Sequence, residues 1–301
     1  MDGLVLVRKP VSWTSHDVVR DLRRTLGEKR VGHFGTLDPL ASGLLLAAVG
    51  RTTRLFPYFA AYPKRYDARV RLGFSTDTYD AEGTPGPTSD RDLPSAEAVA
   101  AELRRFEGEI EQLAPPFSAK KHLGKPLYAY ARKSEDVARK ATRVRVHSIR
   151  LRAFDSPIAE VEVVCSSGTY IRSLAHDLGR ALGCGAHLAG LVRTAIGPHR
   201  LEDARDPDEI RTLRDSGRTD AFLIPPECLL TDLPGFVLDP RQSEDVRNGR
   251  LVRPRSSGDG PCGADAGGGS FVRLLDPDGR LLAMAGPGPE PGTWAPVTVF
   301  P

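Results

Sequence analysis

The decisive stretch of sequence is Gly32-His33-Phe34-Gly35-Thr36-Leu37-Asp38-Pro39-Leu40-Ala41-Ser42-Gly43, which sets one carboxylate on a loop directly before an apolar run. Its glycines let the backbone approach a ligand closely, and Pro39 biases Asp38 toward an extended conformation. Such a loop suits an acid that contacts a substrate. The same motif is also typical of an ordinary turn in which Asp38 starts the next element, so the rest of the chain must decide.

The composition indicates a globular protein of two domains. The chain has 301 residues, of which 40% are hydrophobic, enough to bury a substantial core. It contains neither a run of about 18 apolar residues nor the basic and apolar regions of a signal peptide, so a cytoplasmic location is expected. The four cysteines form no Cys-x-x-Cys pair, and Cys184 with His187 is half a metal site without a second half. Neither a disulfide framework nor a metal is expected.

Positive charge is concentrated between Phe117 and Arg152. This segment carries eleven Lys or Arg residues against Glu135 and Asp136, a net charge of +9 in a chain whose total is only +3. Charge runs usually form solvated surfaces. Here aromatic residues, including Tyr128 and Tyr130, are interleaved with the cations, a combination that neutralises phosphates and stacks on unpaired bases. The segment favours a nucleic-acid partner.

Hydrophobic patterns predict an alternation of strands and helices. Residues 4–7, 66–72 and 159–165 read as strands, whereas 44–49 is buried but too short and continuous to assign. A capping box at Thr14 and Asp17 opens a helix that Gly27 ends. A second helix starts at Ser95, with Val99, Leu103 and Phe106 at helical spacing, and a third follows Thr169 and ends near Gly183. The third places Tyr170 and Arg172 where a strand meets a helix.

Beyond about Asp232 the pattern changes to short apolar pieces between turn signals, such as 271–275 and 297–300 around Asp276-Pro277-Asp278-Gly279. This indicates a small β domain. The segment 254–270 is rich in glycine and serine and is expected to be a mobile loop.

Several common catalytic motifs do not match. Residues 35–43 lack the Gly-Lys-Ser/Thr ending of a phosphate-binding loop, and the chain has neither a Gly-x-Ser-x-Gly elbow nor a second carboxylate at fixed spacing for a glycosidase pair. The remaining combination is an acid on a loop, a basic aromatic segment, and a helix start with Tyr170 and Arg172. It indicates an enzyme that acts on RNA.

The stretch 32–43 resembles the signature of the TruB family of pseudouridine synthases. Other blocks resemble that family in the same order: Lys9-Pro10 with 12–15, Lys64-Arg65-Tyr66, Thr76-Asp77-Thr78-Tyr79-Asp80, 117–120 with 124 and 128–132, 165–172 and 182–188. The resemblance spans about residues 3–230. Several ordered motifs are far more specific than one glycine-rich loop, which disfavours the ordinary-turn interpretation of Asp38.

The resemblance implies roles for individual residues. Asp38 matches the family's catalytic aspartate, Arg172 the arginine that pairs with it, and Tyr66 the tyrosine that stacks on the target base. A guanidinium beside a carboxylate favours its ionised form. Whether Asp38 attacks the sugar or the uracil ring, or whether elimination comes first, stays open.

Further residues match positions around the base and the RNA. The target base must be flipped out of the RNA loop; His33 matches the histidine near the vacated space, and Tyr170 and Leu191 match residues that line the base pocket. Lys9 is expected to support the site or a phosphate. The basic segment corresponds to an RNA-gripping insertion, at about 115–152, with Lys120, Lys121, Lys125, Tyr128 and Arg132 as expected RNA contacts.

The implied fold is α+β: a catalytic domain at 1–231 with a mixed, largely antiparallel sheet and flanking helices, followed by a PUA-like β domain at 232–301. The implied function is isomerisation of uridine to pseudouridine at position 55 in the T-loop of tRNA, without cofactor or guide RNA, by a monomer. The alternatives are a guide-dependent synthase of the Cbf type and a non-catalytic RNA-binding protein. A role in tRNA folding beside catalysis also stays open.

Overall fold

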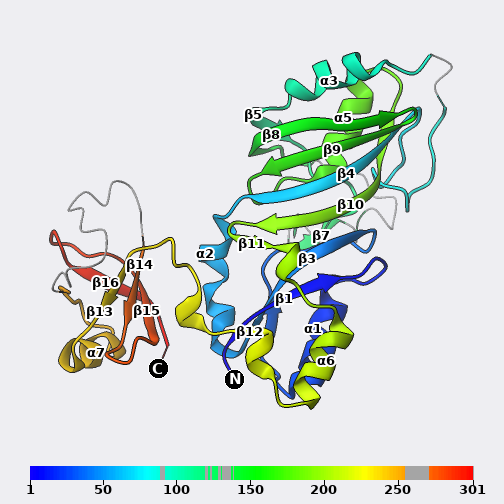
Figure 1. The fold of residues 1–301 in the computed structure, drawn as a ribbon. Helices are drawn as coiled ribbons and strands as arrows, with labels where there is room; N and C mark the ends of the chain where they lie inside the picture. Colours follow the sequence, from blue (N-terminus) through cyan, green and yellow to red (C-terminus); the bar gives the residue numbers. More distant parts are fainter. Residues whose placement is uncertain are drawn as a thin grey trace.

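The computed structural model describes residues 1–88, 92–118, 121–122, 124–127, 130, 137, 139–254 and 271–300, arranged as a large sheet with helices and a small sheet beside it (Figure 1). The strands of the large sheet are β1 (Gly3–Lys9), β2 (Val31–His33), β3 (Ala41–Val49), β4 (Lys64–Leu72), β5 (Gly108–Gln112), β8 (Thr142–Asp155), β9 (Ile158–Cys165), β10 (Ala186–Ile196), β11 (His199–Arg200) and β12 (Leu223–Ile224). The helices are α1 (Ser15–Leu26), α2 (Phe56–Ala60), α3 (Ala96–Arg104), α5 (Ile171–Ala181), α6 (Pro207–Asp215) and α7 (Pro240–Arg247). Short 3-10 helices are η1 (Gly50–Leu55), η2 (Leu201–Asp203), η3 (Thr219–Ala221) and η4 (Pro226–Cys228). None of the helices in these ranges is long and apolar enough to cross a membrane.

The large sheet is mixed and largely antiparallel, as predicted. Its strand order is β12-β1-β3-β10-β4-β9-β8-β5, with β2 added beside β3 and β11 beside β10. Between the named strands of this sheet, β3 and β10 pair in parallel and the other pairs are antiparallel. The parallel pair lies at the middle of the sheet, next to the loop that carries Asp38.

The apolar run that the sequence left unassigned is strand β3. Leu44 and Leu46 face a cluster with α2, whereas Leu45 and Ala47 face a cluster with α1. A strand buried on both faces reads as a continuous apolar run, which is why its period was uninformative. Gly43 lies opposite Arg193 in the last pair of the parallel register with β10. It has φ +104°, and a Cβ there would lie 2.4 Å from the carbonyl oxygen of Arg193.

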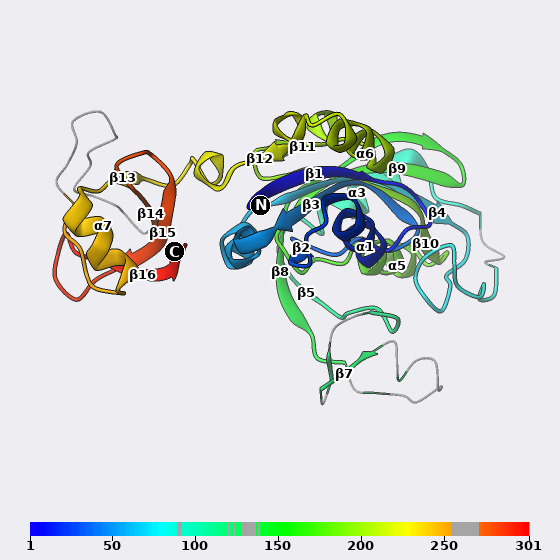
Figure 2. The ribbon, with the colours of Figure 1, turned by 90° about the horizontal axis from the view of Figure 1, so that it is seen from below.

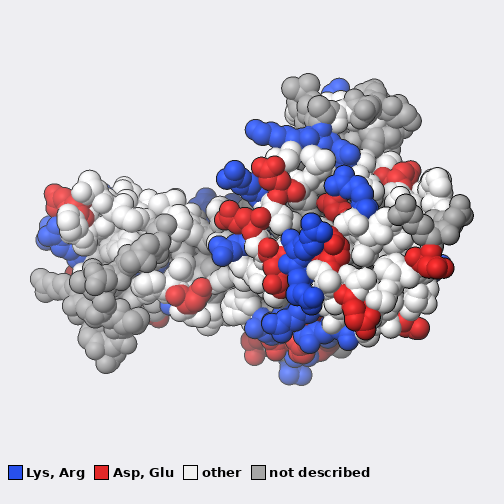
Figure 3. Space-filling view, turned by 90° about the horizontal axis from the view of Figure 1, so that it is seen from above, with Lys and Arg blue, Asp and Glu red and all other residues white. Residues whose placement is uncertain are grey.

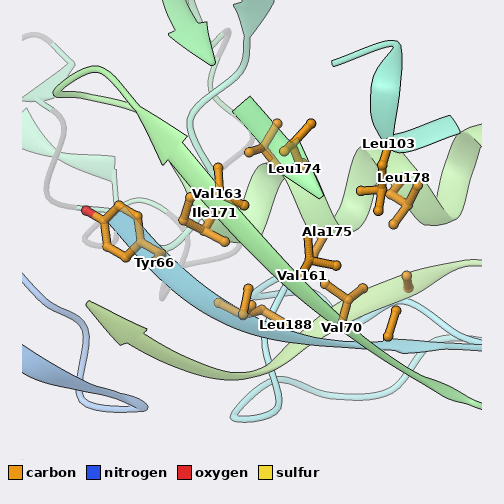
Figure 4. Packing of buried hydrophobic residues seen from close by; sticks show 14 of the residues in the cluster. Tyr66, Val70, Leu103, Val161, Val163, Ile171, Leu174, Ala175, Leu178 and Leu188 are labelled. Atoms are coloured by element: carbon orange, nitrogen blue, oxygen red, sulfur yellow. The ribbon is translucent and has the colours of Figure 1, made fainter. Parts of the chain in front are cut away.

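The helix predictions are confirmed with one exception. The capping box of Thr14 and Asp17 opens α1, and Gly27 ends it in the left-handed conformation at φ 64°. Helix α5 packs Leu174 and its apolar neighbours against β4 and β9 (Figure 4), and Gly183 follows its end at φ 72°. Phe106 lies beyond the end of α3, because the helix ends at Arg104 and two turn residues follow.

The chain leaves the large sheet after β5 and returns to it at β8. Residues 142–152, which the sequence prediction included in the RNA-gripping insertion, belong to β8 and pair with β5 and β9. Between these two strands, β6 (Lys121–His122) and β7 (Lys125–Pro126) form a small hairpin that projects from the body of the molecule (Figure 2).

The C-terminal strands form a separate four-stranded sheet, which confirms the predicted small β domain. They are β13 (Gly235–Val237), β14 (Val272–Leu275), β15 (Leu281–Pro287) and β16 (Trp294–Val299), and the predicted turn at Asp276 joins β14 to β15. This sheet has its own buried cluster with α7, but Met284 and Phe300 pack with Leu4 and Tyr58 of the large unit. The glycine-rich stretch expected to be mobile lies outside the described residues from 255 on.

Candidate active site

Asp38 lies on a loop that closes the β2–β3 hairpin and is held from outside by the start of α1. The hydroxyl of Ser15 accepts a hydrogen bond from the Leu37 N–H at 2.8 Å and donates one to the Leu37 carbonyl at 3.1 Å. The N–H of Ser12 donates to the Pro39 carbonyl at 2.9 Å. The residues on both sides of Asp38 are therefore fixed, while its own side chain remains 39% exposed and accessible to a ligand.

Arg172, in the first turn of α5, pairs with Asp38 as expected. Its Nε lies 2.9 Å from Oδ2 of Asp38, and its Nη1 lies 3.2 Å from Oδ2 of Asp80. Its other donors reach the carbonyls of Thr78 at 3.3 Å and Phe117 at 3.1 Å. Arg172 and Asp80 are both buried, so solvent does not compete for the ion pair that orients the arginine toward Asp38.

Burial raises the pKa of Asp38 above its ordinary value. The charge of Arg172 opposes this rise, and the charge of Asp80 adds to it. A carboxylate that is partly desolvated but paired with a guanidinium is more basic than one in water, a property that suits a nucleophile or a base.

A pocket of about 230 Å³ opens beside this ion pair and collects most of the predicted residues. Its lining residues include Asp38, Arg172, Tyr66, Tyr170 and Leu191, from five different elements or loops. Tyr66 on β4 is buried at the edge of the apolar cluster, and its hydroxyl points away from the packed aliphatic side chains (Figure 4). Gln112 fixes the backbone of Tyr170, accepting from its N–H at 2.7 Å and donating to its carbonyl at 3.0 Å. Burial raises the pKa of both tyrosines.

Lys9 and His33 do not line this pocket. Lys9 ends β1, is fully buried, and donates to the carbonyls of Pro10 at 2.8 Å and Trp13 at 2.5 Å. Burial lowers its pKa to about 8. His33 ends β2, packs its ring edge-on against His16 at 5.6 Å, and has its pKa lowered by burial. Lys9 thus supports the turn that precedes α1, and His33 lies beside the loop.

The predicted RNA contacts fall mostly outside the described part of the chain. Lys120, Tyr128 and Arg132 are not described, and of Lys121 only the backbone, in β6, is described. Lys125 is exposed on β7. Elsewhere, basic side chains on one face of the larger unit are interleaved with acidic ones (Figure 3). Over the described residues no group of three His, Cys, Asp or Glu side chains is placed to hold a metal ion.

Sequence reasoning gave no role to three charged residues of the site: Asp80, Lys64 and Arg193. Asp80 and Lys64 stand in blocks that resemble the family, but the side-chain partners of a loop residue or a strand end cannot be read from a motif. Lys64 is buried, lines the pocket, and donates to the Tyr62 carbonyl at 2.6 Å and to the Ser167 hydroxyl. Arg193 had a usable signal, because it is the one Lys, Arg, Asp or Glu in a largely apolar strand.

Comparisons with known proteins agree with this geometry. Residues 23–171 match the model of the TruB family pseudouridylate synthase N-terminal domain, and residues 172–231 match that of the tRNA pseudouridylate synthase B C-terminal domain. The chain is similar to "tRNA pseudouridine synthase B" of Thermobifida fusca, at 42% identity over 99% of this chain and 98% of the relative. It is similar to the protein of that name from Thiobacillus denitrificans, at 41% identity over 95% and 92%.

A solved structure titled "Crystal Structure of a Cbf5-Nop10-Gar1 Complex" contains a chain with a TM-score of 0.73 and 25% identity, matched over 99% of this chain and 84% of that one. Fold, pocket and relatives together define the class of the protein as a pseudouridine synthase, an isomerase. Within that class, the chain belongs to the TruB family.

Proposed function

We propose that this enzyme isomerises uridine to pseudouridine in tRNA, at position 55 of the T-loop, with Asp38 as the nucleophile. The observation that carries the proposal is the ion pair of Asp38 and Arg172 on the wall of a pocket that Tyr66 also lines. The relatives' name supplies tRNA as the substrate. The position in the T-loop rests on the family resemblance of the motifs around Asp38.

Substrate and product of the reaction have the same atoms and the same oxidation state. The bond between the sugar C1′ and N1 of uracil breaks, the base turns, and a bond forms between C1′ and C5, whose proton is lost as N1 gains one. The carboxylate of Asp38 stabilises the detached state by a transient covalent bond or by proton transfer, and Arg172 keeps it ionised and oriented. Because all of these steps use acid, base and nucleophile, no cofactor enters the proposal.

The substrate must deliver its base to the pocket, which requires the nucleotide to be flipped out of the folded RNA. Tyr66 presents a buried aromatic ring at the pocket wall, suited to stacking on a flipped base. Tyr170 and Leu191 line the same space. Lys9 and His33 support this arrangement from behind the loop rather than as pocket walls. The basic insertion, with Lys120, Lys121, Lys125, Tyr128 and Arg132, would grip the RNA backbone and its bases.

We propose further that the enzyme acts as a monomer without guide RNA, with residues 1–231 as the catalytic domain and 232–301 as an RNA-binding domain of the PUA kind. The relatives named as tRNA pseudouridine synthases, at about 40% identity over nearly the full chain, favour this over the guide-dependent alternative. The likeness to a chain of the Cbf5-Nop10-Gar1 complex is the reason to test the guide-dependent alternative directly. Purified protein incubated with an unmodified tRNA transcript separates the two, because a guide-dependent enzyme leaves the transcript unchanged.

The experiment that tests the proposal maps pseudouridine by carbodiimide labelling on such a transcript, with wild-type protein and the Asp38→Asn variant. We expect modification at position 55 by the wild type, no modification by the variant, and comparable tRNA binding by both. The matched control is Asp67→Asn, an exposed carboxylate one residue after Tyr66 on β4, which should retain full activity. A fully active Asp38→Asn variant would overturn the assignment.

A further inference from the structure

Arg193 is a buried arginine in the middle of the large sheet. It lies on β10, opposite Gly43 of β3 in the parallel pairing and opposite Tyr66 of β4 in the antiparallel pairing. Its exposed fraction is 1%, which places it among the most deeply buried large side chains of the described structure. Arg193 therefore lies between β3, the strand that follows the Asp38 loop, and β4, the strand that carries Tyr66.

The guanidinium of Arg193 holds the loop that carries Asp38. Its Nη2 donates to the carbonyl of Gly35 at 3.1 Å, and its Nη1 donates to the carbonyl of Thr36 at 3.3 Å. Its Nε donates to the carbonyl of Leu44 at 2.8 Å, on the strand that follows the loop. One planar, forked side chain thus ties the start of the Asp38 loop and the strand that follows it to β10, a geometry that lysine cannot reproduce.

The same side chain also reaches Tyr66. A hydrogen bond and the charge of Arg193 oppose the rise that burial causes in the pKa of the Tyr66 hydroxyl. Arg193 therefore contacts both the loop of the nucleophile and the aromatic residue at the pocket wall, and it lines the pocket itself.

Stability alone does not explain why an arginine occupies this place. Among the described residues Arg193 makes no ion pair with a carboxylate, and its recorded hydrogen-bond acceptors are neutral. Burying a charge without an opposite charge is unfavourable, and an apolar side chain of similar volume often serves a core equally well. Its charge is felt across the site, because it helps to lower the pKa values of Lys9 and Lys64.

We propose that Arg193 is a positioning residue for the isomerisation: it fixes the Asp38 loop against the strand of Tyr66 so that carboxylate and ring meet the flipped base in one geometry. This inference rests on the proposed function. Small displacements of a reacting group cost about a hundredfold in rate even when substrate binding is unaffected. The effect of losing Arg193 should therefore appear in the chemical step rather than in tRNA affinity.

The test compares Arg193→Met and Arg193→Lys with the wild type in single-turnover pseudouridine formation on a tRNA transcript, with the dissociation constant for tRNA measured on the same preparations. We expect Arg193→Met to be slower by about 100-fold and Arg193→Lys by about 10-fold, with less than about threefold change in affinity. Contact with Arg172 lowers the pKa of Asp38, and the variants lose part of this contact. The pKa of Asp38 therefore rises, and the acid limb of the pH–rate profile should move to higher pH.

Arg273→Met is the matched control. Arg273 also donates to backbone carbonyls, those of Leu233 at 3.2 Å and Glu227 at 3.1 Å, but it lies in the C-terminal sheet. All rates are compared at a temperature at which circular dichroism shows each protein folded, and Arg193→Lys provides the comparison if Arg193→Met does not fold. The inference would be overturned if the folded Arg193 variants reacted at the wild-type rate or if the acid limb of the pH–rate profile did not move. It would also be overturned if the loss in rate were matched by weaker tRNA binding. An inactive wild type would instead contradict the proposed function.

Discussion

At the level of single residues, Arg172 lies between two carboxylates that differ in exposure. Asp38 faces the pocket, whereas Asp80 is buried and accepts further hydrogen bonds from the Thr78 hydroxyl at 2.5 Å and the Glu82 N–H at 3.1 Å. A carboxylate with this many fixed donors cannot reorient easily. Asp80 therefore acts as the immobile anchor of the arginine, and Asp38 as its partner that substrate can reach.

Replacing Asp80 by asparagine should test this division. The variant keeps the volume but loses a charge-assisted contact with Arg172, which is typically worth about 2 kcal/mol, so we expect a rate of pseudouridine formation about 30-fold lower. Removing the negative charge also lowers the pKa of Asp38, since Asp80 contributes to its rise. The acid limb of the pH–rate profile should therefore move to lower pH.

The control for this variant is Asp77→Asn in the same loop. Asp77 is exposed and accepts from the Thr84 N–H at 2.7 Å without contacting Arg172. Single-turnover rates measured across the acid range for both variants provide the comparison. If Asp80→Asn reacts at the same rate as Asp77→Asn and its pH–rate profile does not move, Arg172 needs no buried anchor.

The family resemblance predicted Asp38, Arg172 and Tyr66 as a set, and the structure brings the three to one pocket although 134 positions separate the first two. It could not predict Asp80 as the second partner of Arg172, because that contact depends on how the 76–80 loop folds back on α5. It also gave His33 and Lys9 as substrate-binding residues; the structure places neither on the pocket wall, and their contact with substrate stays a prediction. Motifs identify residue types along the chain, but which side chain faces a cavity is decided by tertiary packing.

At the level of elements, the insertion between β5 and β8 is tied to the active site at both of its ends. Its first part offers the carbonyl of Phe117 to Arg172, and its last part offers Arg139, whose Nη1 donates to the carbonyl of Ala114 at 3.0 Å and the hydroxyl of Tyr79 at 3.4 Å. Tyr79 stacks on His176 of α5 with ring centroids 3.8 Å apart. The insertion thus packs against the elements that hold Arg172.

We expect Arg139→Ala to loosen the insertion and to weaken tRNA binding by about fivefold, because hydrogen bonds of this kind contribute about 1 kcal/mol. Filter binding or fluorescence anisotropy with a labelled tRNA measures the change. Arg150→Ala, which removes an exposed arginine of β8, serves as the control for a general loss of positive charge. If both variants lose the same affinity, charge rather than anchoring explains the role of Arg139.

Helices and strands with a cap or an alternating pattern in their own sequence could be predicted. Those whose pattern depends on the elements packed against them could not. The capping box of α1 and the alternating pattern of β4 needed no tertiary information. By contrast, β3 is apolar on both faces because α1 and α2 cover it from opposite sides, so no period revealed it as a strand. Similarly, residues 142–152 are rich in arginine, which suggested the insertion, yet they alternate with apolar residues that pack in the sheet.

On the scale of the whole molecule, the small C-terminal sheet shares a hydrophobic cluster with the large unit. Phe300 and Met284 pack with Tyr58 of α2, and the Tyr58 hydroxyl lies 3.0 Å from that of Thr298. The ring of Tyr58 also meets that of Phe271 edge-on at 4.9 Å. An interface of this kind resembles a domain core more than a linker contact, so the two units should unfold together.

We expect Phe300→Ala to lower the free energy of unfolding by about 3 kcal/mol, the lower end for a buried phenylalanine, and to separate thermal unfolding into two transitions. Differential scanning calorimetry measures both effects. Val297→Ala on β16 is the control, since that side chain is 60% exposed and its loss should leave a single transition. Identical melting curves for the two variants would contradict a shared core.

The close approach of Gly43 to the backbone of Arg193 also predicts how freely this sequence can vary. With φ at +104° and a carbonyl oxygen only 2.4 Å from where a Cβ would be, no side chain fits without separating β3 from β10. Gly27, at φ +64° with nothing within 4 Å, is far less constrained and should accept asparagine. Deep mutational scanning should therefore find position 43 intolerant of every substitution, although Gly43 is buried and does not line the pocket.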